Sequence, residues 1–123
     1  VVVRDANGNP VAGVPVTFTV GTGGGSISGV NAVSNANGVA TLGSWTLGST
    51  VGSNTVIASS TGLANSPLTV TATGTAGAAT QLSLNGGSTA GSVNTAVAVP
   101  PSVVVRDANN NPVAPVAISA LCI

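Results

Sequence analysis

The side chains of this chain that could carry out chemistry are few and far apart. Its only charged residues are Arg4, Asp5, Arg106 and Asp107, and it contains no histidine, lysine or glutamate. A serine or threonine nucleophile needs a general base of suitable pKa, and glycoside hydrolysis needs two carboxylates close together. Asp5 and Asp107 lie 102 positions apart. The sequence therefore predicts no catalytic residues, no bound cofactor and no enzymatic activity.

The best candidate for a ligand site is the alternation of Asp5, Asn7 and Asn9, the spacing of the first oxygen ligands in a calcium loop. The rest of the pattern departs from such a loop, because glycine is fourth instead of sixth and the twelfth position is Val16 instead of glutamate. Asp and Asn also bond the backbone two residues on, and Gly8 accepts a positive φ without steric cost. We therefore interpret the segment as a turn and expect no metal there.

Three other features have a simpler structural interpretation. Residues 21–26 are rich in glycine, but they lack the lysine and the following helix of a phosphate-binding loop, so we expect a flexible loop between strands. Cys122 is the only cysteine, which excludes an internal disulfide and leaves no second thiolate for a metal. Trp45 is the only tryptophan, and we expect it to fill the core rather than to stack on a sugar.

Alternating apolar and polar residues predict several β-strands. Val14, Val16, Phe18 and Val20 alternate with Pro15, Thr17 and Thr19, which indicates a half-buried strand over residues 14–20 with its threonines toward solvent. The same alternation at Leu68, Val70 and Ala72 predicts an antiparallel strand with one face toward water. Two further strands are predicted in the first half: residues 39–47, with a bulge at Gly43, and residues 54–59, with Val56 and Ala58 inward. Two more are predicted over residues 81–84 and 93–99. Pro100 and Pro101 lack backbone donors and should interrupt the ladder before Val103.

The two ends of the chain repeat each other. Residues 1–18 and 103–120 are identical at 12 of 18 positions, at an offset of 102. A period near one hundred residues matches a whole β-sandwich rather than a solenoid unit. We therefore expect tandem domains cut out of phase: later strands of one domain over 1–74, a linker over 75–78, and the first strands of an incomplete second domain over 79–123.

The net charge and the hydropathy of the chain argue against two kinds of partner, nucleic acids and membranes. The formal net charge is zero, so no basic surface is available to neutralise phosphates, and we expect no nucleic-acid partner. No apolar run approaches the roughly 20 residues of a membrane-spanning helix, so we expect no direct membrane insertion.

Three motifs carry a resemblance to a known family. They are the turn and strand from Val3 to Phe18, repeated from Val105; the S-N-A-N-G-V-A-T segment from Ser34 to Thr41; and W-T-L-G-x-x-x-G-x-N-T-V-x-A from Trp45 to Ala58. With them the chain resembles the bacterial immunoglobulin-like repeats of the invasin and intimin type. The resemblance implies an all-β, Greek-key immunoglobulin-like sandwich without a buried disulfide, strung in tandem on bacterial secreted or outer-membrane-anchored adhesins.

The expected function is mechanical. The resemblance implies a spacer repeat at the cell surface or outside the cell, whose partners are neighbouring immunoglobulin-like repeats of the same chain. A host or cell-surface receptor or glycan would then be bound by other parts of the parent protein. Two alternatives stay open: a protein- or glycan-binding module with an exposed aromatic or polar cluster at one loop end, and an accessory spacer domain of a large extracellular hydrolase.

Overall fold

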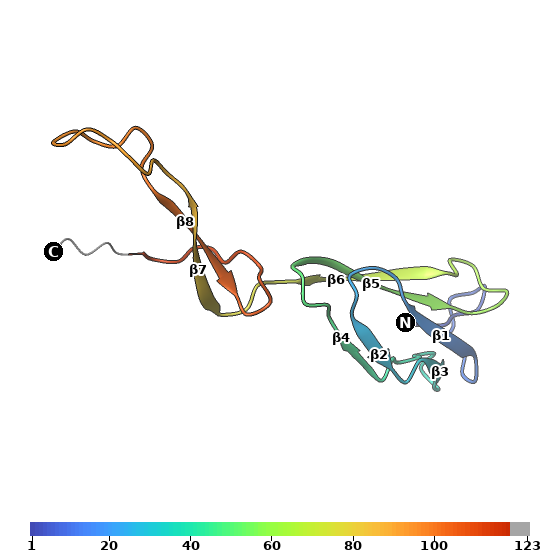
Figure 1. Ribbon diagram of the computed structural model, residues 1–123. Helices are drawn as coiled ribbons and strands as arrows, with labels where there is room; N and C mark the ends of the chain where they lie inside the picture. The colour runs from blue at the N-terminus through green and yellow to red at the C-terminus, as the bar shows by residue number, and fades with distance from the viewer. Residues whose placement is uncertain (119–123) are drawn as a thin grey trace. The chain divides into compact units, whose positions relative to one another are not determined.

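The chain is all-β. The computed structural model describes residues 1–118, in which eight strands and no helix occur (Figure 1). The described residues therefore contain no helix of the length and apolarity needed to cross a bilayer. The chain divides into two compact units, Val1–Thr75 and Ala76–Ile123, which are described separately below. Cys122 lies outside the described residues.

The first unit consists of two antiparallel sheets. The four-stranded sheet has the order β3-β1-β5-β6, in which β1 lies between strands distant from it in sequence, as Greek-key connections produce. The second sheet pairs β2 with β4, and Ile27 and Trp45 from these strands pack against the core. The bounds are β1 (Pro15–Val20), β2 (Ser26–Ser28), β3 (Asn31–Val33), β4 (Ser44–Thr46), β5 (Gly52–Ser59) and β6 (Leu68–Gly74).

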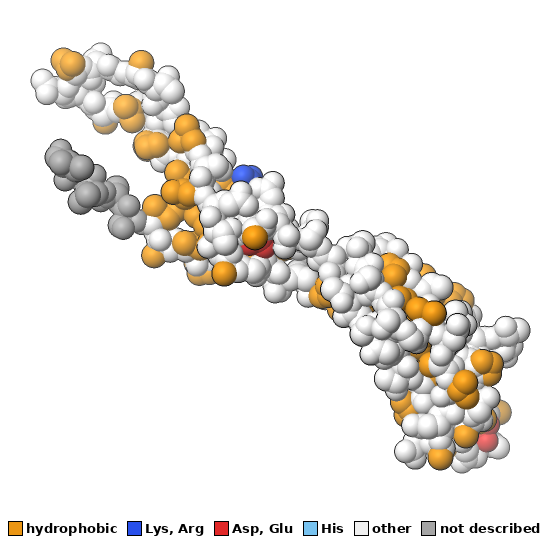
Figure 2. All heavy atoms as spheres, turned by 60° about the horizontal axis from the view of Figure 1, so that its bottom comes forward, with side chains coloured by type: hydrophobic (Ala, Val, Ile, Leu, Met, Phe, Trp, Pro, Cys, Tyr) orange, Lys and Arg blue, Asp and Glu red, His pale blue; other side chains and the backbone are white. Residues whose placement is uncertain are grey.

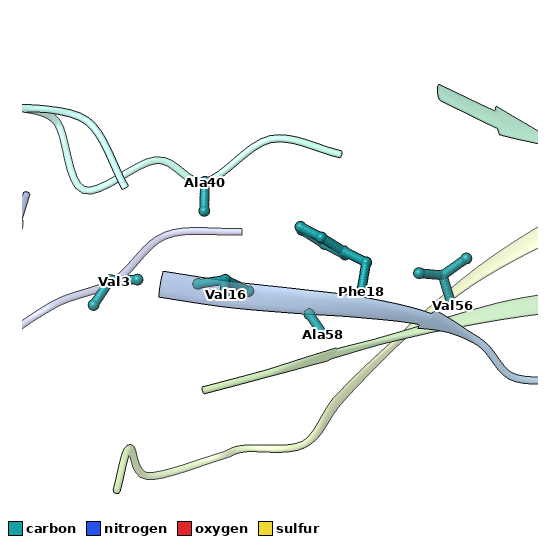
Figure 3. Packing of buried hydrophobic residues seen from close by; sticks show 6 residues of the cluster. All are labelled: Val3, Val16, Phe18, Ala40, Val56 and Ala58. Atoms are coloured by element: carbon teal, nitrogen blue, oxygen red, sulfur yellow. The ribbon is translucent and has the colours of Figure 1, made fainter. Parts of the chain in front are cut away.

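The core lies between these layers and is made of valine and alanine side chains around one phenylalanine. Val16 and Phe18 of β1 are buried, and the register sets Phe18 opposite Ala58 of β5. Figure 3 shows Ala40 pointing toward β1 and Val3 lying beside Val16. Val16 and Phe18 of β1 and Val56 and Ala58 of β5 are buried as predicted, whereas Val20, on the same face of β1, is 40% exposed. Trp45 packs on the core while staying half-buried. The buried hydrophobic cluster is Val3, Val16, Phe18, Ala40, Val56 and Ala58.

The prediction for β6 is only partly correct. The strand forms, and its register places Leu68 and Val70 opposite Ala58 and Val56, on the core side of the sheet. Leu68 and Val70 nevertheless remain 46% and 38% exposed. β6 is the edge strand of its sheet and pairs with β5 alone.

The predicted strand over residues 39–47 is wrong in its extent. Only β4 belongs to a sheet ladder, while Val39 forms an isolated antiparallel bridge with Val2. Gly43 lies between Val39 and β4. A side chain at Gly43 would collide with the backbone of Ser28 and Gly29. The glycine thus marks a close approach of two backbones rather than a bulge within one strand.

The second unit is a two-stranded antiparallel sheet of β7 (Ala79–Gly86) and β8 (Ser102–Asp107). β8 begins directly after Pro101, as the loss of backbone donors at the two prolines predicts. The predicted strand over 93–99 is wrong, because these residues lie in the connection between β7 and β8 and are exposed. Among the described residues, no apolar side chain of this unit is buried, and Figure 2 shows hydrophobic side chains at the surface.

Replacement of Phe18 tests the core of the first unit. Phe18→Ala removes the largest buried side chain and should lower the free energy of unfolding by about 3–5 kcal/mol. Thr19→Ala, on the exposed face of the same strand, should change it by less than about 1 kcal/mol. Urea unfolding followed by Trp45 fluorescence reports this unit alone, and equal losses in both variants would contradict the assignment.

Candidate functional site

The candidate ligand residues Asp5, Asn7 and Asn9 form a closed turn. The Oδ1 atom of Asp5 accepts the backbone N–H groups of Asn7 and Asn9 at 2.9 and 2.8 Å, and its Oδ2 accepts the side-chain amide of Asn9 at 3.2 Å. The Asp5 carbonyl accepts the N–H of Gly8, and the Asp5 N–H donates to the Asn9 carbonyl. Gly8 has a φ of 82°, which explains the glycine at this position.

The same turn recurs at Asn35, with an amide in place of the carboxylate. Asn35 Oδ1 accepts the N–H groups of Asn37 and Val39 at 2.9 and 3.0 Å, and the Asn35 carbonyl accepts the N–H of Gly38. Gly38 again has a positive φ, of 74°. Because a neutral side-chain oxygen serves equally well here, the feature that the two turns share is a hydrogen-bond acceptor and not a negative charge.

A third turn, at Asp107 in the second unit, repeats the first. Its Oδ1 accepts the N–H groups of Asn109 and Asn111, both at 2.9 Å, and its Oδ2 accepts the Asn111 amide at 3.1 Å. Asn110 takes the place of glycine with a φ of 70°, a conformation that Asn tolerates better than most residues. One donor is additional, since the N–H of Gly77 also bonds Oδ2 at 2.9 Å.

The two aspartate turns differ in their surroundings. Asp5 and Asn9 are exposed, whereas Asp107 and Asn111 are only 3% and 6% exposed. The backbone N–H of Asn111, followed by that of Gly77, stabilises the Asp107 carboxylate and lowers its pKa to about 2. The N–H groups around Asp5, chiefly that of Asn9, lower its pKa too. The two turns thus differ in one backbone donor: the N–H of Gly77 bonds Asp107.

This geometry bears on the metal interpretation. The structure brings Asp5 and Asn9 into contact, while Asn7 contributes its backbone N–H. The carboxylate oxygens face N–H donors, and those hydrogen bonds account for the spacing of the motif without a cation. Within residues 1–118, no group of three His, Cys, Asp or Glu side chains comes together. These hydrogen bonds close a hairpin, and the geometry gives no support for a metal site there.

Arg4 does not pair with Asp5. Its guanidinium donates to the carbonyl of Gly8 at 3.2 Å, across the same turn. The charged side chains of the first unit therefore both serve this hairpin.

Sequence reasoning missed Asn54, whose side chain bonds both ends of the connection between β4 and β5. Its side chain is buried on β5, where Oδ1 accepts the N–H of Gly48 at 2.9 Å and Nδ2 donates to the carbonyl of Gly52 at 3.3 Å. A side chain at Gly23 would collide with Asn54, so this glycine permits a close approach. The available signal was a polar residue at the same strand parity as the inward Val56.

The glycine-rich loop of residues 21–26 connects β1 to β2, as predicted, but it is held in place. Thr22 donates its N–H to Thr55 Oγ1 at 2.7 Å, and the N–H of Gly21 donates to the Thr55 carbonyl at 2.8 Å. These N–H groups are engaged with β5 and so do not line a phosphate site. Gly21, Gly23 and Gly25 permit close packing, because a side chain at any of them would collide with neighbouring atoms.

Ser34 is the second buried polar residue that the sequence did not single out. Its Oγ donates to the carbonyl of Val11 at 2.7 Å and accepts the N–H of Val14 at 2.9 Å. Ser34, which directly precedes the second turn, thereby holds the segment from Val11 to Val14, between the first turn and β1.

Substitutions of the two turn glycines separate conformational strain from packing. Gly8→Ala should cost about 1–2 kcal/mol, because φ is positive but the space is open. Gly38→Ala should cost a further ~1–3 kcal/mol, because its side chain would collide with the Val3 carbonyl. Gly8→Asn should cost least, as Asn110 indicates. Urea unfolding gives the three values, and a Gly8→Ala loss as large as that of Gly38→Ala would contradict this explanation.

The comparisons with known proteins agree with these features. The family described as Bacterial Ig-like domain (group 1) matches residues 1–73, which is more than half of the chain and contains the first two turns and the whole core. No curated protein and no solved structure matches the chain. Domains of this group occur in bacterial surface or extracellular proteins and are generally non-enzymatic binding or structural modules. The chain belongs to the group 1 bacterial Ig-like domain family.

Proposed function

We propose that this chain is part of a spacer: a series of immunoglobulin-like repeats that extends a bacterial surface or secreted protein and presents a distal binding region. The observation that carries the proposal is the recurrence of one turn 102 residues apart. Asp5 and Asp107 accept the same three hydrogen bonds from residues at the same relative positions. A period of this length supports one sandwich per repeat, with neighbouring repeats as partners.

The placement of the aromatic side chains favours a spacer over a binding module. Phe18 is buried and Trp45 packs on the core, and they are the only aromatic residues of the chain. Binding hot spots are commonly built around exposed aromatic anchors. A spacer needs a fold that closes on its own core and offers little to other surfaces, and the net charge of zero fits this role.

The proposed location is the cell surface or the extracellular space, with an outer-membrane anchor elsewhere in the parent protein. An accessory domain of an extracellular hydrolase is the competing role. It would be recognised by paired carboxylates in the flanking chain, because the two aspartates here both serve turns.

Concatenated chains test the spacer role. The test uses three chains, with one, two or three copies of residues 1–102, and each chain ends with a single copy of residues 103–123. The maximum dimension measured by small-angle X-ray scattering should increase by a constant increment per copy. The increment is constant because each repeat folds on its own core. Trp45 fluorescence confirms that each copy is folded. An increment that shrinks with each added copy would mean that the repeats collapse on one another and would contradict the proposal.

A further inference from the structure

Asp107 holds the first residues of the second unit through three separate contacts. Its Oδ2 atom accepts the backbone N–H of Gly77 at 2.9 Å. Its backbone lies opposite Ala79 in the β7–β8 register, and its carbonyl accepts the side-chain amide of Gln81 at 2.6 Å. One residue of β8 therefore fixes the chain of its own unit from Gly77 onward.

The second carboxylate oxygen of Asp107 has a role that the turn itself does not require. At Asn35, a single amide oxygen accepts the two N–H groups that close the turn. At Asp107, Oδ1 accepts the two equivalent N–H groups, while Oδ2 accepts the Asn111 amide and the N–H of Gly77. An asparagine would place an NH₂ group at the position of Oδ2, and such a group donates hydrogen bonds but cannot accept them. The carboxylate is therefore needed for the contacts of Oδ2 rather than for the turn.

The burial of Asp107 favours retention of the Gly77 bond. Asp107 is 3% exposed, so solvent has little access to its carboxylate. Arg106, the only positively charged residue of the second unit, donates to Ser83 Oγ at 3.4 Å. A buried carboxylate has to be satisfied by hydrogen bonds, and bonds to a charged acceptor are about twice as strong as bonds between neutral groups. Release of Gly77 would remove one donor from a charged oxygen that water does not readily reach.

The first unit fixes the chain as far as Gly74. This glycine is the last residue of β6 and lies opposite Gly52 in the β5–β6 register. Only Thr75 and Ala76 lie between this ladder and the residue that bonds Asp107. Of the four residues expected to link the two domains, 75–78, the last two are thus held by contacts within the second unit.

We propose that the Asp107 carboxylate sets the length of the free joint between successive repeats. With Gly77 bound to Oδ2, the joint consists of Thr75 and Ala76; with Gly77 released, it extends over residues 75–78. The span of a flexible segment grows with the square root of its length, so a longer joint gives each repeat more freedom, and this freedom accumulates along a series. The inference rests on the proposed spacer function and adds the residue that controls the stiffness of the spacer.

The substitution Asp107→Asn in the full chain tests the role of the second oxygen. The variant keeps the Oδ1 acceptor that closes the turn, as Asn35 shows, but it cannot accept the N–H of Gly77. The Gly77 amide should exchange with solvent roughly tenfold faster or more. By ¹⁵N relaxation, the order parameters of Gly77 and Ala78 should fall from about 0.85, the value of rigid backbone, to below about 0.6.

The matched control is Gln81→Ala, which removes the neighbouring hydrogen bond to the Asp107 carbonyl and keeps the carboxylate. It should leave the order parameters of Gly77 and Ala78 unchanged, and the amides of β8 should stay protected in both variants. Unchanged order at Gly77 in Asp107→Asn would overturn the proposal. An equal loss of order in Gln81→Ala would do so too, because the β7–β8 sheet would then be loosened as a whole.

A measurement on the unmodified chain decides the matter even where Asp107→Asn does not fold. The amide proton shift of Gly77 is followed by NMR while the Asp107 carboxyl carbon titrates, and both should change with the same midpoint. A Gly77 shift that stays constant through this titration would overturn the proposal. Scattering from the concatenated chains tests the spacer role separately: a constant increment together with a mobile Gly77 would remove this inference and leave the spacer, whereas a shrinking increment together with an ordered Gly77 would remove the spacer alone.

Discussion

A single hydrogen-bond arrangement determines how this chain returns on itself: a side-chain oxygen that accepts the backbone N–H groups two and four residues later. It occurs at Asp5, Asn35 and Asp107. In the first unit it sets the position of Val3, which bonds the second turn through Gly38 and the return strand of the first turn through Val11. Without these two turns, Val3 and Ala40 would not meet the face of β1, and the core would lose one side.

The core that the turns close is small and contains one aromatic residue. Burial of β-branched side chains against Phe18 therefore has to be efficient, and buried polar residues assist it. Asn54 and Ser34 satisfy backbone groups that the short strands leave unpaired, as buried N–H and C=O groups require. The described part of the second unit, residues 76–118, has the turn and the ladder but buries no apolar side chain, and the leucines of β7 lie at the surface.

The elements that could be predicted from the sequence are those whose pattern matches a local cause. Alternation identified β1 and β5 because each has one buried and one solvent face, and the Asp-Ala-Asn-Gly pattern identified the turn at Asp5. Alternation alone was misleading at residues 93–99, because a strand also needs a partner. The exposure of Leu68 and the burial of Asp107 depend on which distant segment covers them, so neither could be inferred locally.

The same turn is exposed at Asp5 and covered by the N–H of Gly77 at Asp107. The most direct measurement is a pH titration of the two aspartate carboxyl carbons by NMR. We expect Asp107 to titrate near pH 2, below the ordinary value of 3.8. Because its pKa is lowered by folding, the stability that it contributes is present above pH 3.8 and is lost as the pH falls toward 2. An Asp107 midpoint near 3.8 would mean that the backbone N–H groups of Asn111 and Gly77 do not stabilise this carboxylate.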